Sequence, residues 1–241
     1  MMKNRAMRMA MGTGAAVLMT MSVISGSFAK YVTSGNGTDS ARAAKFGVEV
    51  KANGTMFASE YKKDDDSVVG TIVNSVVSSG GTNDHVVAPG TKGELVKTTI
   101  SGKPEVAVKV SYEPTLNLEG WEYVDDDSNL STEYFPIIFN VGDKKYGITG
   151  TKDSEGIKIT NGSANIEELK NAVENAIKAY SKNYAANTDL ALVAPDYVNV
   201  SWEWAYSGNS DEKDTYLGNQ AAVNKGATVE LSMKTTVTQI D

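Results

Sequence analysis

The side chains that most often carry out catalysis are scarce in this sequence. His85 is the only histidine among 241 residues, and there is no cysteine. A zinc site would therefore have at most one nitrogen ligand, with carboxylates supplying the others. The HExxH, GxSxG, Walker-type and GxGxxG motifs are all absent, and His85 has no nucleophile motif beside it. We expect no catalytic residue, no metal site and no cofactor, although paired carboxylates for glycoside cleavage stay open among 30 acidic residues.

Three aromatic residues are the strongest candidates for ligand contact. Trp202, Trp204 and Tyr206 stand at every second position, so in a strand they share one face. Such a row forms either the densest part of a core or an exposed platform for stacking sugars. We favour the core, and the platform would make the chain a carbohydrate-binding module.

Two acidic triplets interrupt the chain, at 64–66 and 125–127. Short runs of like charge are typical of solvated loops. A calcium-binding loop is the alternative reading of each, since carboxylate oxygens are the ligands that calcium prefers.

The first 29 residues have the order of parts found in a secretory signal peptide. Three basic residues lie within the first eight positions, an uncharged run covers 14–24, and small residues precede Lys30. The apolar run is shorter than the roughly 20 residues that span a bilayer. We therefore expect cleavage between Ala29 and Lys30, with membrane contact only during export, and a secreted product in the extracellular matrix or at the cell surface.

Charge and composition limit the partners of the exported chain. The net charge of −7 becomes −10 for residues 30–241, because only positive charges are removed with the leader. Nucleic acid would be repelled by such a surface. Without cysteine the exported chain has no disulfides, so it must fold around an apolar core. We expect one β-rich domain over 43–241.

Alternating apolar and polar residues predict strands through most of this domain. The segment 105–113 is the clearest, with Val106, Val108, Val110 and Tyr112 on one face. Turns recur about every ten residues, which is typical of an antiparallel β-sandwich or jelly roll. Further strands are expected at 44–51, 56–58, 67–78, 92–101, 134–141, 144–148, 156–160, 196–206 and 227–240.

The periodicity changes to that of a helix over about 163–185. Apolar residues recur there at spacings of three, four and seven, which predicts one amphipathic helix packed on the sheet. Asn165 is expected to cap its first turn, with Glu168 three residues later as in a capping box. A short helical turn is also expected near 211–216.

Residues 30–42 read as an exposed N-terminal arm. Lys30, Tyr31, Val32 and Thr33 can extend as a strand, and the flexible segment 34–37 follows. A free extended arm can complete the sheet of a neighbouring subunit by strand addition. Because such a contact is heterologous, it propagates a filament. A disordered terminus is the simpler alternative.

Four stretches resemble the TasA/camelysin family of exported proteins from Gram-positive bacteria. They are Gly26–Tyr31, Ser40–Val50, the segment from Pro89 through Ile100–Tyr112, and Thr228–Gln239. Residues 118–216 have no counterpart in the resemblance.

The resemblance implies a jelly-roll subunit of extracellular biofilm-matrix fibres. A SipW-type signal peptidase would process the chain, a companion matrix protein would be a candidate partner, and the processed arm from Lys30 to about Ser40 would be donated to the next subunit. Part of the family carries a metallo-endopeptidase label. We do not expect that activity here as the leading function, because the sequence has a single histidine and no motif with the spacing of zinc ligands.

Overall fold

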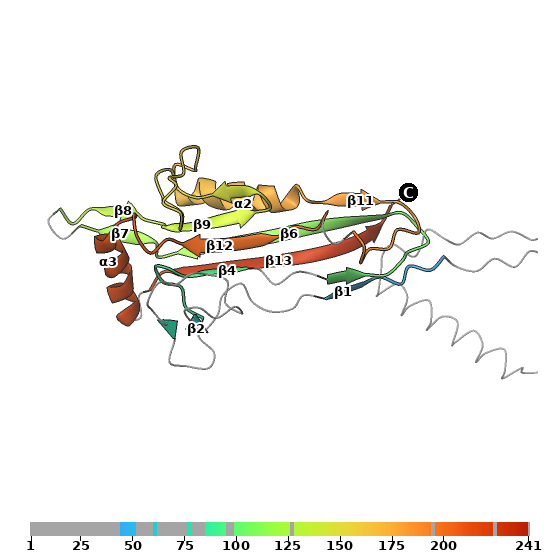
Figure 1. Cartoon of the computed structure of the whole chain (residues 1–241), viewed down its shortest axis with the longest axis horizontal. Coiled ribbons are helices and arrows are strands. Elements are labelled where there is room, and N and C mark those ends of the chain that lie inside the picture. Colours follow the sequence, from blue (N-terminus) through green and yellow to red (C-terminus); the bar gives the residue numbers. More distant parts are fainter. Residues whose placement is uncertain are drawn as a thin grey trace, which may run out of the picture.

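The computed structural model is mostly β, with antiparallel sheets and two helices among the described residues (Figure 1). It describes residues 44–51, 60–61, 77–78, 85–94, 99–125, 128–193, 196–223 and 226–240. The predicted signal peptide, the arm, the strand at 56–58 and the acidic triplet at 64–66 lie outside these residues. The prediction of an antiparallel β-sandwich with an amphipathic helix packed on it is confirmed.

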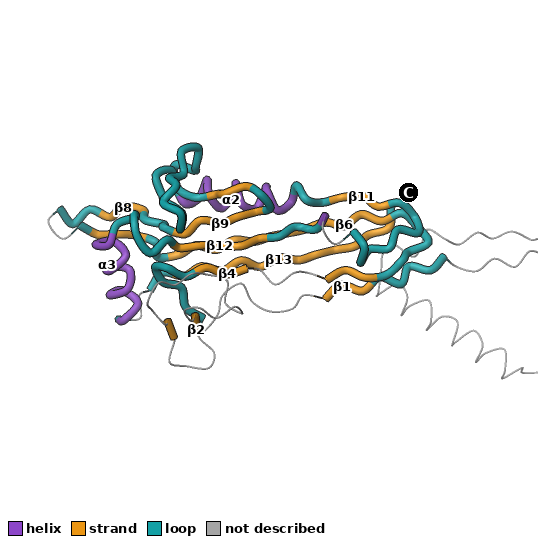
Figure 2. Tube along the Cα trace, viewed as in Figure 1, coloured by secondary structure: helices purple, strands orange, loops and turns teal. Residues whose placement is uncertain are grey.

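One layer of the sandwich is a three-stranded sheet built around two long strands. Its order is β11-β6-β13, and β6 and β13 run along the length of the molecule (Figures 1 and 2). The strands are β6 (Val108–Glu119), β11 (Lys182–Tyr184) and β13 (Thr228–Gln239). Because β6 and β13 pair over twelve residues, from Thr228 opposite Glu119 to Gln239 opposite Val108, their register is fixed along the whole strand.

The second layer is a four-stranded antiparallel sheet of order β10-β9-β12-β4. Its strands are β4 (Lys92–Glu94), β9 (Ile137–Val141), β10 (Lys144–Tyr146) and β12 (Val200–Trp204). A two-residue turn joins β9 to β10, and Gly142 supplies the positive φ of 58° that this turn requires. The turn places Lys145 directly opposite Asn140.

Three two-stranded antiparallel ladders complete the described strands. The pairs are β1 (Glu49–Lys51) with β5 (Thr99–Ser101), β2 (Glu60–Tyr61) with β3 (Val77–Ser78), and β7 (Glu122–Val124) with β8 (Ser131–Glu133).

The core lies between the two main sheets. The inward residues of β6 alternate with exposed ones, so that Val108, Val110, Tyr112 and Leu116 are buried. The facing sheet contributes its own inward rows: Ile137, Phe139, Val141, Val200, Trp202 and Trp204. Trp121 contacts both Phe135 and Trp204 in edge-to-face geometry. Burying these rows supplies the hydrophobic stabilisation that a chain without disulfides needs.

Helix α2 (Ile166–Lys178) closes one side of the sandwich, where it contacts β6, β9 and β10. Its apolar stripe Leu169, Val173 and Ile177 is fully buried. The predicted cap is confirmed: Asn165 accepts a hydrogen bond from the N–H of Glu168 at 2.8 Å. The helix ends at Lys178, earlier than predicted.

Helix α3 (Asp211–Ala222) packs beside β7 at the end of the molecule far from the C-terminus (Figure 1). Only a short turn was predicted there. Leu217 is its single buried residue. Tyr123 donates a hydrogen bond to Glu212 at 2.6 Å and its ring contacts Tyr216, so the helix is held mainly by its polar and aromatic side chains.

Several predicted elements differ from those in the structure. The predicted strand 92–101 divides into β4 and β5, which belong to different sheets. Only the last three residues of the predicted strand 44–51 form β1. The predicted strand 134–141 is shorter in the structure, because β9 begins at Ile137, directly after Pro136, and is flanked by β10 and β12. Pro136 therefore costs the sheet no hydrogen bond.

Candidate functional site

The outer edge of β6 is closed by hydrogen bonds from beyond the sheet. Next to the segment paired with β11, the N–H of Tyr112 donates to Ser181 Oγ at 3.4 Å. The N–H of Leu116 donates to Glu174 Oε1 of α2 at 3.0 Å. Pro114 lies between them and has no N–H. This edge therefore has few groups left for pairing with another chain.

The outer edge of β13 is open within the described part of the chain. In the β6–β13 ladder the even-numbered residues of β13 face β6, as the bond from the N–H of Ile240 to the carbonyl of Ala107 shows at the end of the register. The odd-numbered residues 229–239 therefore direct their N–H and C=O groups outward. No strand among the described residues pairs with them.

The side chains of this open edge present an apolar row that is only half covered. Val229, Leu231, Met233 and Val237 are partly buried and pack against the core, while the alternate residues 228, 230, 232, 234 and 238 are exposed. The hydroxyl of Thr235 lies buried in the row without a hydrogen-bond partner. A row of this kind, beside unpaired backbone groups, is what an added strand would cover.

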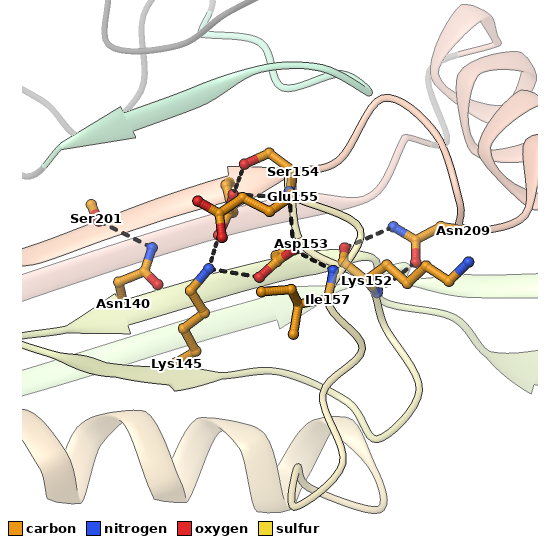
Figure 3. Close-up of polar contacts among 10 residues, drawn as sticks. Asn140, Lys145, Lys152, Asp153, Ser154, Glu155, Ile157, Ser201 and Asn209 are labelled. Carbon is orange, nitrogen blue, oxygen red and sulfur yellow. Dashed lines mark hydrogen bonds and ion pairs between the residues drawn. The ribbon is translucent and has the colours of Figure 1, made fainter.

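A second site lies on the outer face of the four-stranded sheet. Lys145 Nζ lies 2.7 Å from Asp153 Oδ2 (Figure 3). The same nitrogen lies 3.2 Å from Glu203 Oε1. The Asp153 side chain is fully buried and that of Glu203 nearly so, whereas Lys145 is 39% exposed. We call these three residues the Lys145 cluster.

The loop after β10 holds the Lys145 cluster in place. Asp153 Oδ1 accepts the backbone N–H groups of Glu155 and Ile157 at 3.0 and 2.7 Å. Ser154 donates its hydroxyl to Glu203 Oε2 at 2.5 Å and its N–H to the same atom at 3.1 Å. The loop thereby covers β12 and removes both carboxylates from water.

The ionisation of the cluster follows from these contacts. Desolvation opposes the charge on Lys145, but the hydrogen bonds and charges of Asp153 and Glu203 outweigh it and raise the pKa of the amine. Burial likewise disfavours the charged form of Asp153. The hydrogen bonds from Lys145 and from the N–H of Ile157 nevertheless lower the pKa of that carboxyl.

A hollow of about 240 Å³ opens beside the cluster. Lys145, Glu203 and Ser154 line it together with polar residues of the sheet, among them Asn140 and Ser201. Asn140 donates to Ser201 Oγ at 3.2 Å across the β9–β12 pair. Water can thus reach the cluster through this hollow, on the side where Lys145 is partly exposed.

The structure separates the predicted ligand-contact residues. Trp202 and Trp204 are buried in the core, whereas Tyr206 is 59% exposed. The core interpretation is confirmed for the two tryptophans and is wrong for Tyr206, and the stacking platform of three aromatics is not formed. The predicted cleavage position, Ala29 and Lys30, and the assembly residues Tyr31, Val32 and Thr33 lie outside the described residues.

Sequence reasoning did not find the Lys145 cluster. Lys145 and Asp153 are eight residues apart, and Glu203 comes from a different strand. Only the order β10-β9-β12 brings Lys145 and Glu203 onto one face.

Two kinds of feature are absent from the described ranges. No group of three or more histidine or acidic residues there has the arrangement of a metal site. No helix in those ranges is long and apolar enough to cross a bilayer.

Comparison with family models, with curated proteins and with solved structures finds no match to this chain.

Proposed function

We propose that this chain is an exported structural subunit that assembles into extracellular fibres. The processed arm, residues 30–42, adds as a strand to the open edge of β13 in the next copy. The observation that carries this proposal is the contrast between the two edges of the three-stranded sheet: one is closed by β11 and α2, and no strand among the described residues pairs with the other.

The lengths of arm and edge support the pairing. An extended arm of thirteen residues reaches about 45 Å. The twelve residues of β13 span about 40 Å. The arm can therefore lie along most of the edge and cover the half-buried row there.

The placement of the arm's root supports growth in one direction. The described chain begins at residue 44, and the segment before β1 lies near the end of the molecule at which β13 finishes (Figure 1). A donor at one end and an acceptor along another surface make a heterologous contact, which does not close on itself. Repetition of that contact gives a filament of identical subunits.

The test is to place a charge in the acceptor row of mature protein that begins at Lys30. Leu231→Lys puts a charge in the half-buried row, where a charge opposes strand addition. Ser232→Lys is the matched control, because Ser232 is the next residue and points to solvent. We expect Leu231→Lys to abolish fibres seen by electron microscopy and Ser232→Lys to keep them.

Circular dichroism would check that both variants remain folded. Fibres from a folded Leu231→Lys protein, in the same amount as from the control, would refute the β13 edge as the acceptor.

A further inference from the structure

We propose that Lys145 and Asp153 form an intramolecular isopeptide bond, with Glu203 moving the proton. The bond would be an amide between Lys145 Nζ and the side-chain carbonyl carbon of Asp153. This inference does not depend on fibre assembly, because all three residues belong to one chain.

The amine of Lys145 already lies against the carboxyl group that it would attack. Lys145 Nζ lies 2.7 Å from Asp153 Oδ2 (Figure 3). The Asp153 side chain has no exposure to water, and two backbone donors fix it in place. Holding two reactants in contact removes much of the entropic barrier to their reaction.

The other oxygen of Asp153 occupies a site suited to developing negative charge. When an amine attacks the carboxyl carbon, charge builds on the oxygen that remains as the carbonyl. Asp153 Oδ1 receives the N–H groups of Glu155 and Ile157, at 3.0 and 2.7 Å. Two backbone donors on one oxygen are the arrangement that stabilises an oxyanion.

Glu203 is positioned to carry protons. Its Oε2 is held by the hydroxyl and the N–H of Ser154, which leaves Oε1 facing Lys145 Nζ at 3.2 Å. A carboxylate within hydrogen-bond reach of the amine can act as a general base and then as a general acid.

The reaction balances without any added reagent. The ammonium of Lys145 passes one proton to Asp153 Oδ2 along their hydrogen bond, which leaves a neutral amine and a carboxylic acid. The amine nitrogen attacks the carboxyl carbon, and Glu203 takes a proton from that nitrogen. Glu203 returns the proton to the departing hydroxyl, the carbon–oxygen bond breaks, and one water leaves. The products are an amide, water and the original Glu203 carboxylate.

The surroundings suit this sequence of steps. The net pKa shifts of Lys145 and Asp153 favour the ion pair, so the first proton transfer is the uphill step, and the burial of both groups reduces its cost. The released water has an exit, because the cluster borders the hollow of about 240 Å³ and Lys145 is partly exposed.

The bond would fasten the loop after β10 to the strand that precedes it. That loop is also tied to the chain before α3, since Asn209 accepts from the N–H of Lys152 at 2.9 Å and donates to its carbonyl at 3.3 Å. In a chain without cysteine, an isopeptide bond would be a covalent tie that reducing agents cannot break.

The test is the mass of the intact, denatured protein that begins at Lys30. We expect it to be lower than the sequence mass by one water. Trypsin should fail to cut after Lys145, and fragment spectra should show a branched peptide joining Lys145 to Asp153.

Two variants and a control test whether the lost water comes from the reaction of Lys145 with Asp153. Lys145→Arg keeps the positive charge without a nucleophilic amine, so it should have the full sequence mass. Glu203→Gln keeps the side-chain shape but removes the base, so it should also have the full mass or lose the water much more slowly. Lys144→Arg, at the neighbouring exposed lysine, should still lose one water.

A wild-type protein that is folded by circular dichroism, has the full sequence mass and is cut after Lys145 would overturn the proposal. The cluster would then be an ion pair only. A water loss that persists in Lys145→Arg would overturn it as well, because it would place the dehydration elsewhere, as in a succinimide.

Discussion

Glu174 of helix α2 accepts a hydrogen bond from the backbone N–H of Leu116 in β6, at 3.0 Å. A helix side chain here does what a neighbouring strand would otherwise do. Leu116 is fully buried, so its N–H has no access to water as an alternative partner. The bond closes one edge of the three-stranded sheet, whose other edge, β13, has no pairing strand in the described part of the chain.

Removing this carboxylate should destabilise the fold. Glu174→Ala leaves a buried N–H without a partner, which costs about 1–3 kcal/mol of unfolding free energy. Glu174→Gln retains an acceptor oxygen and should cost less. Urea unfolding would measure the loss in both variants, provided that the dependence of the unfolding free energy on urea concentration is the same as in the wild type. Equal midpoints for Glu174→Ala and the wild type would mean that the bond does not hold the edge.

Stability should fall at high pH, in part through Tyr112. Burial raises the pKa of its hydroxyl from 10.0 to about 12. Below pH 10 the hydroxyl is neutral in both states, so this contribution is fully present. Between pH 10 and about 12 the unfolded chain loses the proton before the folded one, and stability falls by at most about 3 kcal/mol.

Tyr112→Phe should therefore reduce the loss of stability measured by urea unfolding between pH 9 and pH 12. Part of the loss should remain, because burial also raises the pKa of Tyr184 and Tyr197. An identical pH profile in the variant and the wild type would contradict the assignment to Tyr112.

Substituting the buried and the exposed aromatic residues of the row 202–206 should have different effects on stability. Trp202→Ala removes a buried side chain and should cost about 3–5 kcal/mol. Tyr206→Ala alters a mostly exposed side chain and should cost less than about 1 kcal/mol. Thermal unfolding of both variants makes the comparison. Similar losses for the two would argue against the separation of core and surface along this segment.

The cap of α2 offers a local test. Asn165→Ala removes the acceptor for the N–H of Glu168 and should cost about 1 kcal/mol, whereas Asn165→Asp should be nearly neutral. Chemical denaturation would rank the two variants. A loss in Asn165→Asp as large as in Asn165→Ala would show that the side-chain oxygen is not what stabilises the helix.

Local patterns were sufficient to predict the elements whose residues all face one core. The alternation through Val108 and Tyr112 predicted their burial, because a strand with one buried face repeats every two residues. The stripe of α2 was predicted for the equivalent reason, with a helical period, and its Asn165 cap was predicted from Glu168 three residues later. The long strand β13 was also predicted nearly in full.

Long-range pairing accounts for what was missed. Residues 92–101 have a continuous strand pattern, but β4 pairs with β12 and β5 pairs with β1, which local sequence does not encode. The helix α3 has one buried residue and almost no apolar stripe, so its periodicity gave little signal.

Predicting the two candidate sites requires knowledge of the strand pairing even more than predicting the strands does. Whether β13 is an edge strand follows from the sheet order and not from its own residues. The Lys145 cluster needs the β9–β10 turn, the following loop and β12 to meet. In the sequence, nothing distinguishes its lysine and its two acidic residues from charged residues on an exposed surface.

The most direct test of the fibre proposal is electron microscopy of two purified proteins at equal concentration. One begins at Lys30 and the other lacks residues 30–42. The proposal predicts filaments from the first and single molecules from the second. Filaments from the shortened protein, or a strictly monomeric protein with the arm intact, would contradict assembly by donation of the N-terminal strand.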